Sequence, residues 1–194
     1  MNNLARYLVR LENKQKYTPK DASSFAKQVR EVLGAKEAIG HLRISSRAVE
    51  FDLFAENSPA LNKSKAALEK NFERIITLKL LDKAPVPGDR LEILKEGISL
   101  FNEERFWECH EVLEQIWHPA EGEERDIIQG LILTAAAFVH AQRNRTERSI
   151  AMLKKAKQKL GTRASYQGID LNTVRKNIDA VIDSSLPAPF QVKL

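Results

Sequence analysis

The first 84 residues alternate between two patterns of apolar positions. Apolar side chains recur at every second residue, as in half-buried strands, in the segments 5–11, 38–44, 47–54 and 73–81. They recur at helical spacing in residues 22–33 and again after Ser58-Pro59. The resulting order, β-α-β-β-α-β, is the split arrangement of the ferredoxin-like fold. We therefore predict an α+β domain of this kind over residues 1–84.

From residue 89 onward the apolar spacing is helical throughout. It predicts five helices, over residues 89–101, 104–118, 122–142 and 146–160 and after Asp170. Short loops between them favour an antiparallel helix bundle over residues 85–194. Two prolines and a glycine within residues 82–88 mark the boundary between the two domains.

A ferredoxin-like sheet is covered by helices on one face only. The other face is expected to show basic side chains, drawn from Arg6, Arg10, His41, Arg43 and Lys79. A basic sheet face suggests RNA binding, but the aromatic residues on which bases normally stack are missing here. Docking of this face against the second half of the chain, or against a partner, is therefore the favoured interpretation.

Charge is distributed unevenly along the chain, whose net charge is +5. Residues 1–84 hold 16 lysines and arginines against 10 acidic residues. Residues 103–126 contain nine acids and two bases, whereas residues 143–163 contain eight bases and one acid. Such blocks could attract a polyanion such as RNA, bind an acidic protein, pair with each other across a helix pair or support a homo-oligomer. A solvated helix face is the more common outcome for charge runs.

Composition narrows the class of protein. The apolar fraction of 43% and charged fraction of 29% are those of a globular protein rather than a disordered one. Cys109 is the only cysteine, which excludes an internal disulfide and fits a reducing compartment. Arg6 and Arg10 interrupt any secretory signal, and the longest apolar run, residues 130–141, is too short to span a membrane. We expect a cytoplasmic protein with no membrane partner.

The segment FWECHEVLEQIW, residues 106–117, places polar side chains inside an apolar helix pattern. His110 and Glu114 are four residues apart and share a helix face, while Glu111 lies about 100° around the helix from His110. An antiparallel partner over residues 122–142 would bring Arg125 and Gln129 to the level of these residues. His140 would lie about another 12 Å along that helix, too far to share a metal with His110.

Two interpretations of this cluster remain open. His110 and Glu114 could bind a divalent metal, with Glu111 as the base that activates water and with Arg125 and Gln129 holding an anionic or carbonyl group. Alternatively, the same residues could form a structural hydrogen-bond network in which Arg125 neutralises Glu114, because buried charge is tolerated only when it is paired. Three further residues are expected to support the cluster without reacting: Asn102, Trp117 and His140.

Two neighbouring features have simpler explanations. Cys109 is expected to be a small buried residue rather than a nucleophile, because adjacent helix positions do not face each other. Gly130 lies in a helix interior, where glycine costs about 1 kcal/mol relative to alanine. Close packing of another helix against Gly130 would justify that cost.

The segment FNEERFWECHEVLEQIW and the following ERDIIQGLI resemble a bacterial and archaeal family, domain of unknown function 309. The resemblance extends over about residues 89–160 and rests on matching residues in two helices: Phe101, Asn102, Phe106, Glu108, His110, Glu111, Leu113, Glu114 and Trp117, then Arg125, Gln129, Gly130, Leu131, Ile132, Ala135 and His140. It implies a small helical domain of the kind labelled a predicted metal-dependent hydrolase. It does not account for residues 1–84.

The chain departs from the family pattern at two places. Leu133 stands where the family has a second glutamine, and Arg143-Asn144 and Arg148-Ser149 replace pairs that contain glycine. Two functions follow as hypotheses: a metal-assisted hydrolase with a site at His110, Glu111 and Glu114, or a non-catalytic module that binds RNA, a ribosome or a protein.

Overall fold

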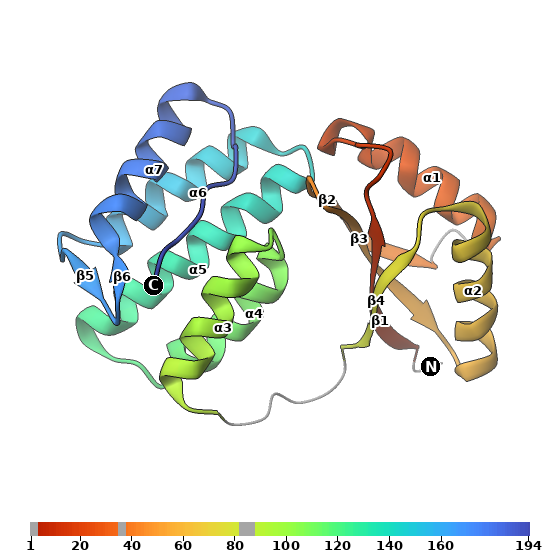
Figure 1. Ribbon diagram of the computed structural model, residues 1–194, viewed down its shortest axis with the longest axis horizontal. Helices are drawn as coiled ribbons and strands as arrows, with labels where there is room; N and C mark the ends of the chain where they lie inside the picture. The colour runs from red at the N-terminus through yellow and green to blue at the C-terminus, as the bar shows by residue number, and fades with distance from the viewer. Residues whose placement is uncertain (1–3, 35–37, 82–87) are drawn as a thin grey trace. The chain divides into compact units, whose positions relative to one another are not determined.

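The computed structural model describes residues 4–34, 38–81 and 88–194, and most of the predicted boundary at residues 82–88 lies outside them. The chain forms two compact units. The first contains residues 1–84 together with 142–144, and the second contains residues 85–141 and 145–194. Each unit has its own hydrophobic core, and both units are drawn in Figure 1.

The first unit is a mixed α+β structure with a four-stranded antiparallel sheet. Its strands are β1 (Ala5–Glu12), β2 (Ile39–Ile44), β3 (Ala48–Ala55) and β4 (Ile75–Leu80). Its helices are η1 (Pro19–Asp21), α1 (Ala22–Leu33) and α2 (Ser58–Asn71). The strands lie in the order β2-β3-β1-β4, and every neighbouring pair is antiparallel. The predicted strands and helices of this unit are confirmed.

One face of the sheet packs against α1 and α2, which lie on the same side of it (Figure 1). Val9 of β1 and Phe51 of β3 pair in register and are completely buried there with Val29 and Leu68 from the two helices. Side chains alternate between the two faces of a strand, so this register fixes which residues point the other way. A local correction concerns α2, whose N-terminus is capped by Asn57, not by Ser58.

The opposite face of the sheet is not simply basic. Asp52 accepts from Arg6 at 2.8 Å and lies 2.6 Å from Nδ1 of His41. Glu50 lies 2.7 Å from Arg10 and 3.5 Å from Arg43. The predicted basic residues are therefore interleaved with two carboxylates of β3. The alternation of β3 placed these acids on the same face, but the prediction counted only the bases.

The second unit is helical apart from one short hairpin. Its helices are α3 (Arg90–Asn102), α4 (Phe106–Trp117), α5 (Gly122–Gln142), α6 (Thr146–Lys159) and α7 (Leu171–Ser184). All five predicted helices are confirmed. The sequence did not predict the hairpin of β5 (Ser165–Tyr166) and β6 (Ile169–Asp170). Within the described residues, no helix combines the length and apolar character needed to cross a membrane.

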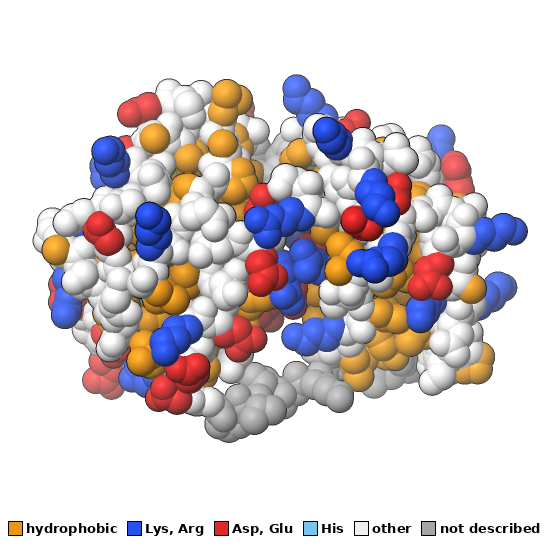
Figure 2. All heavy atoms as spheres, in the orientation of Figure 1, with side chains coloured by type: hydrophobic (Ala, Val, Ile, Leu, Met, Phe, Trp, Pro, Cys, Tyr) orange, Lys and Arg blue, Asp and Glu red, His pale blue; other side chains and the backbone are white. Residues whose placement is uncertain are grey.

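The charge blocks of this unit partly neutralise each other across helices. Lys159 of α6 lies 2.6 Å from Asp126 of α5, and Arg163 lies 3.1 Å from Glu123. Acidic and basic side chains are correspondingly interspersed on the face drawn in Figure 2. Pairing across a helix pair, one of the sequence-level alternatives, therefore accounts for part of both blocks.

Gly130 of α5 packs tightly against the end of α6. A β-carbon at this position would lie 2.7 Å from Cγ of Leu160 and 2.9 Å from its backbone nitrogen. Leu160 is fully buried, so neither atom has room to move away. The close packing predicted for this glycine is confirmed.

We expect Gly130→Ala to destabilise the protein by about 1 to 3 kcal/mol, although alanine is the better helix former, because the added methyl group overpacks a full core. Chemical denaturation measures the free energy of unfolding. Gln158→Ala on the exposed face of α6 is the control and should change that free energy by less than about 0.5 kcal/mol. An unchanged or raised stability in Gly130→Ala would contradict the packing argument.

Candidate functional site

The candidate site lies on one face of α4, where His110, Glu111 and Glu114 come together. One possible ligand atom from each residue lies within 4.8 Å of the other two, so the group could hold a metal ion. The side chains are 28%, 49% and 38% exposed, respectively. The cluster is thus open to solvent at the protein surface, not enclosed in the core.

Helix packing explains why this face is exposed. The opposite face of α4 is held in the core by Cys109, Leu113 and Ile116, each at most 2% exposed. Residues 110, 111 and 114 fall on the remaining part of the helix circumference. Cys109 is confirmed as a small packed side chain because it is completely buried. Burial also raises the pKa of its thiol, which disfavours the thiolate that a nucleophile needs.

The imidazole ring of His110 contacts a different carboxylate with each nitrogen. Nδ1 lies 3.4 Å from Oε1 of Glu111, and Nε2 lies 3.5 Å from Oε1 of Glu114. The nearby carboxylate of Glu111 raises the pKa of His110 above its ordinary value, the negative charge of Glu114 raises it further, and burial acts in the opposite direction. At neutral pH, a proton and a metal ion would therefore compete for this ring.

The spacing of Nε2 and the Glu114 oxygen fits a shared metal ion. Nitrogen and oxygen ligands lie about 2.0 to 2.2 Å from zinc, so two ligands of a tetrahedral ion are roughly 3.4 Å apart. The observed 3.5 Å matches that separation. Glu111 then lies on the other ring nitrogen, where a carboxylate orients a metal-binding histidine.

Arg125 binds the C-terminal end of α4. Its Nη1 donates to the carbonyl oxygens of Trp117, His118 and Ala120 at 3.1 to 3.2 Å. Its guanidinium carbon lies 4.1 Å from the centre of the Trp117 ring. Arg125 thus satisfies free carbonyls at the end of α4, and it forms no ion pair with Glu114 in the part of the chain that the structure describes.

Other predicted residues are distributed along α5. Gln129 and Leu133 are both half-buried one turn apart, and His140 lies near the end of the helix. The described residues that could hold a metal together do not include His140, in agreement with the helix spacing. The roles predicted for Arg125 and Gln129 toward a substrate remain predictions.

Asn102 fastens the C-terminal tail to the helices. Its Nδ2 donates to the Val192 carbonyl at 2.8 Å, and its Oδ1 accepts from the Val192 amide at 2.8 Å. Phe190 of the tail packs with its ring centre 5.5 Å from that of Phe101. This role is structural, and its partner lies 90 residues away and left no sign in the local pattern. The support predicted from Asn102 for the His110 cluster stays a prediction.

Glu108 is a site-adjacent residue whose function sequence reasoning missed. Both of its oxygens accept from Arg105 at 2.8 Å, and the side chain is only 6% exposed. A bidentate pair at the first turn of α4 fixes the start of the helix that holds the cluster. The spacing of Arg105 and Glu108, three residues apart, was the available signal.

Comparison with known proteins places part of the chain in a family. Residues 94–152 match a family model described as Domain of unknown function (DUF309), which confirms the resemblance over that segment. No curated protein matches the chain. A conserved hypothetical protein from Thermus thermophilus, known from a crystal structure, is 33% identical, and the match covers 46% of this chain and 94% of that one, with a TM-score of 0.42.

The raised pKa of His110 makes a prediction about pH. The cluster's contribution to fold stability, which is small for partly exposed groups, should be complete below pH about 6.5 and lost as pH rises through the raised pKa. We expect Glu111→Gln to lower the pKa of His110, measured by NMR titration of the ring protons, because the largest cause of the shift is removed. Glu121→Gln in the α4–α5 loop is the control and should leave it unchanged. Titration of His110 below the ordinary histidine range would contradict the geometry.

Proposed function

Because residues 94–152 match a family whose function is unknown, we propose a function from the geometry of α4: a divalent-metal site that supports hydrolysis. The observation that supports it is the 3.5 Å separation of His110 Nε2 and Glu114 Oε1 on a solvent-accessible helix face. A bound divalent cation would supply Lewis acidity and a nucleophilic water at neutral pH. Exposure leaves room for substrate beside the ligands.

The chain's own residues have separate roles in this proposal. His110 and Glu114 bind the metal, through Nε2 and Oε1. Glu111, whose Oε1 lies 3.4 Å from Nδ1, would favour the tautomer that carries its proton on Nδ1 and so leave the lone pair of Nε2 free for the metal. This contact makes Glu111 a positioning residue, and its predicted action as a base would use its second carboxylate oxygen.

The competing structural network has less support. That account required Arg125 to neutralise Glu114, whereas the hydrogen bonds of Arg125 go to backbone carbonyls. It also required burial, since an unpaired charge is costly only where water is excluded. Glu111 and Glu114 are 49% and 38% exposed. Solvated carboxylates beside a histidine gain little stability for the fold, and metal binding gives them a function.

A second candidate is a binding module for RNA or another polyanion. The observation that favours it is a set of exposed cations on and just before α6, which form no ion pair with any described residue: Arg145, Arg148, Lys154 and Lys155. The sheet unit adds little to this function, because Glu50 and Asp52 offset its basic face.

For the first unit we infer the ferredoxin-like arrangement. The strand order β2-β3-β1-β4, the antiparallel pairing and the position of both helices on one face support it. The unit would then be a separate module joined to the helical one.

Metal binding tests the proposal directly. We expect purified protein, stripped of metal and titrated with zinc in a calorimeter, to bind one equivalent. His110→Ala and Glu114→Gln should abolish binding because each removes a ligand, and Glu111→Gln should weaken it about 10- to 100-fold because it removes only the orienting group. Affinity should rise with pH as His110 loses its proton.

His118→Ala is the matched control, since His118 is an exposed histidine at the end of the same helix, outside the cluster. It should bind zinc as the unsubstituted protein does. Binding that survives His110→Ala, or none in the unsubstituted protein, would contradict the proposal. Binding to RNA that weakens steeply with salt would then favour the module instead.

A further inference from the structure

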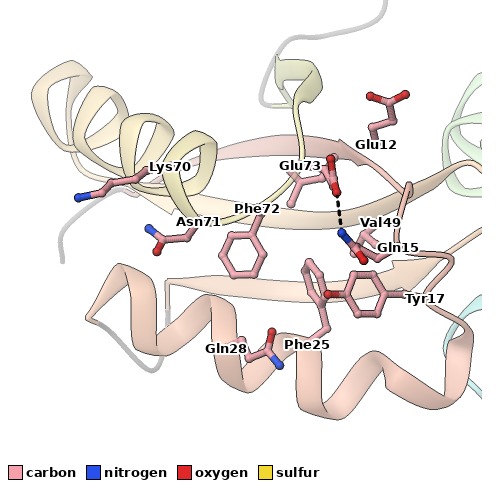
Figure 3. Close-up of a pocket in the computed structure, with 11 residues that line it drawn as sticks. Glu12, Gln15, Tyr17, Phe25, Gln28, Val49, Lys70, Asn71, Phe72 and Glu73 are labelled. Carbon is pink, nitrogen blue, oxygen red and sulfur yellow. Dashed lines mark hydrogen bonds between the residues drawn. The ribbon is translucent and has the colours of Figure 1, made fainter.

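The first unit contains a cavity of about 280 Å³ that is separate from the α4 cluster. It lies between α1, the end of α2 and the loop after β1 (Figure 3). Its lining combines apolar side chains from the core with polar groups at the rim. The rings of Tyr17, Phe25 and Phe72 lie next to one another in its lining (Figure 3).

These three rings form a continuous aromatic wall. The centres of Tyr17 and Phe25 are 5.0 Å apart with the rings at 73°, and those of Phe25 and Phe72 are 5.1 Å apart at 45°. Rings at such angles present both edges and faces to a neighbouring group. The faces carry negative potential and attract cations, most strongly where water is partly excluded.

The charge at the rim has the sign that a cation requires. Glu73 accepts a hydrogen bond from Gln15 at 3.2 Å, which holds its carboxylate beside the rings (Figure 3). Among the described residues, Glu73 forms no ion pair. The helix α2 ends at Asn71, so the negative end of its dipole also points to this region.

The remaining charged residues of the lining do not offset Glu73. The amine of Lys70 extends away from the rings in Figure 3. Glu12 is directed away as well and pairs with Lys14 at 3.2 Å. The aromatic wall, the carboxylate and the helix terminus therefore all favour positive charge at the same place.

We propose that this cavity binds a small organic cation, an ammonium group attached to a short apolar chain. The ammonium group would lie against the rings of Phe72 and Tyr17 with Glu73 as its counter-ion. An anion would meet the carboxylate and the negative helix end, and a neutral ligand would gain nothing from either. This site requires no metal and is independent of the function proposed for α4.

Choline and its neutral isostere, 3,3-dimethylbutan-1-ol, are the probes. The two differ in charge and hardly in shape, so comparing them isolates the cationic contribution. We expect choline to shift the amide resonances of the cavity residues in NMR titrations of the full chain, and the alcohol to bind about 10-fold more weakly. Equal affinity for the two probes, or no choline-dependent shift around the cavity, would overturn the proposal.

Two substitutions test whether the preference for choline over the alcohol arises in this cavity. Glu73→Gln removes the charge and keeps the shape, and Phe72→Leu removes a ring and keeps an apolar side chain, so each should reduce the preference for choline several-fold. Glu69→Gln on the exposed face of α2 is the control and should preserve it. The same spectra report whether each variant is folded. A preference for choline that persists in Glu73→Gln and Phe72→Leu would place the binding elsewhere and overturn the assignment.

Discussion

The antiparallel pairing of α4 with α5 is the constraint on which the candidate site depends. It is fixed at both ends by particular contacts. At one end the Phe106 and Phe138 rings stack with their centres 4.9 Å apart. At the other, Arg125 bonds to the last carbonyls of α4 and covers the Trp117 ring. These contacts at both ends oppose rotation of α4 about its axis and keep the face that carries His110 at the surface.

This orientation separates residues that hold the fold from residues of the candidate site on a single helix. Glu108 lies within reach of Arg105 and stabilises the helix start, where its negative charge also suits the helix dipole. One turn later, Glu111 and Glu114 have only a histidine as an ion-pair partner among the described residues. Two glutamates of equal intrinsic acidity thus lie at the partly exposed candidate site, while a third stabilises the start of the helix. Their surroundings make the difference.

Much of the architecture followed from local spacing. Strands and helices were predictable because alternation and helical periodicity depend on neighbouring residues. The close packing at Gly130 was predictable because glycine is unfavourable in a helix interior unless another element approaches it closely. The His110 and Glu114 pair was predictable from helical periodicity. The partners of Arg125 were not predictable from the sequence. A guanidinium binds a carboxylate and the carbonyls of a helix end equally well, and only its position in the folded structure determines which of the two it contacts. The bond of Asn102 to Val192 joins residues distant in sequence, and the pairing of Glu50 and Asp52 with arginines required the strand order.

The aromatic cavity of the first unit was likewise not predictable from the sequence. Tyr17, Phe25 and Phe72 come from a loop, a helix and a helix end, and each reads in the sequence as ordinary core. Their convergence with Glu73 is a property of the folded unit alone. Local pattern predicts the elements of this protein, whereas the chemistry of both proposed sites arises where elements meet or where packing fixes a helix face.

The central claim is that Glu111 orients the His110 ring so that Nε2 is presented to Glu114. Long-range proton–nitrogen NMR correlations of metal-free protein, recorded above the pKa of His110, identify the nitrogen that carries the proton in the neutral ring. The account predicts the proton on Nδ1, the nitrogen that lies 3.4 Å from Glu111. A proton on Nε2 would leave no lone pair directed at Glu114 and would contradict it.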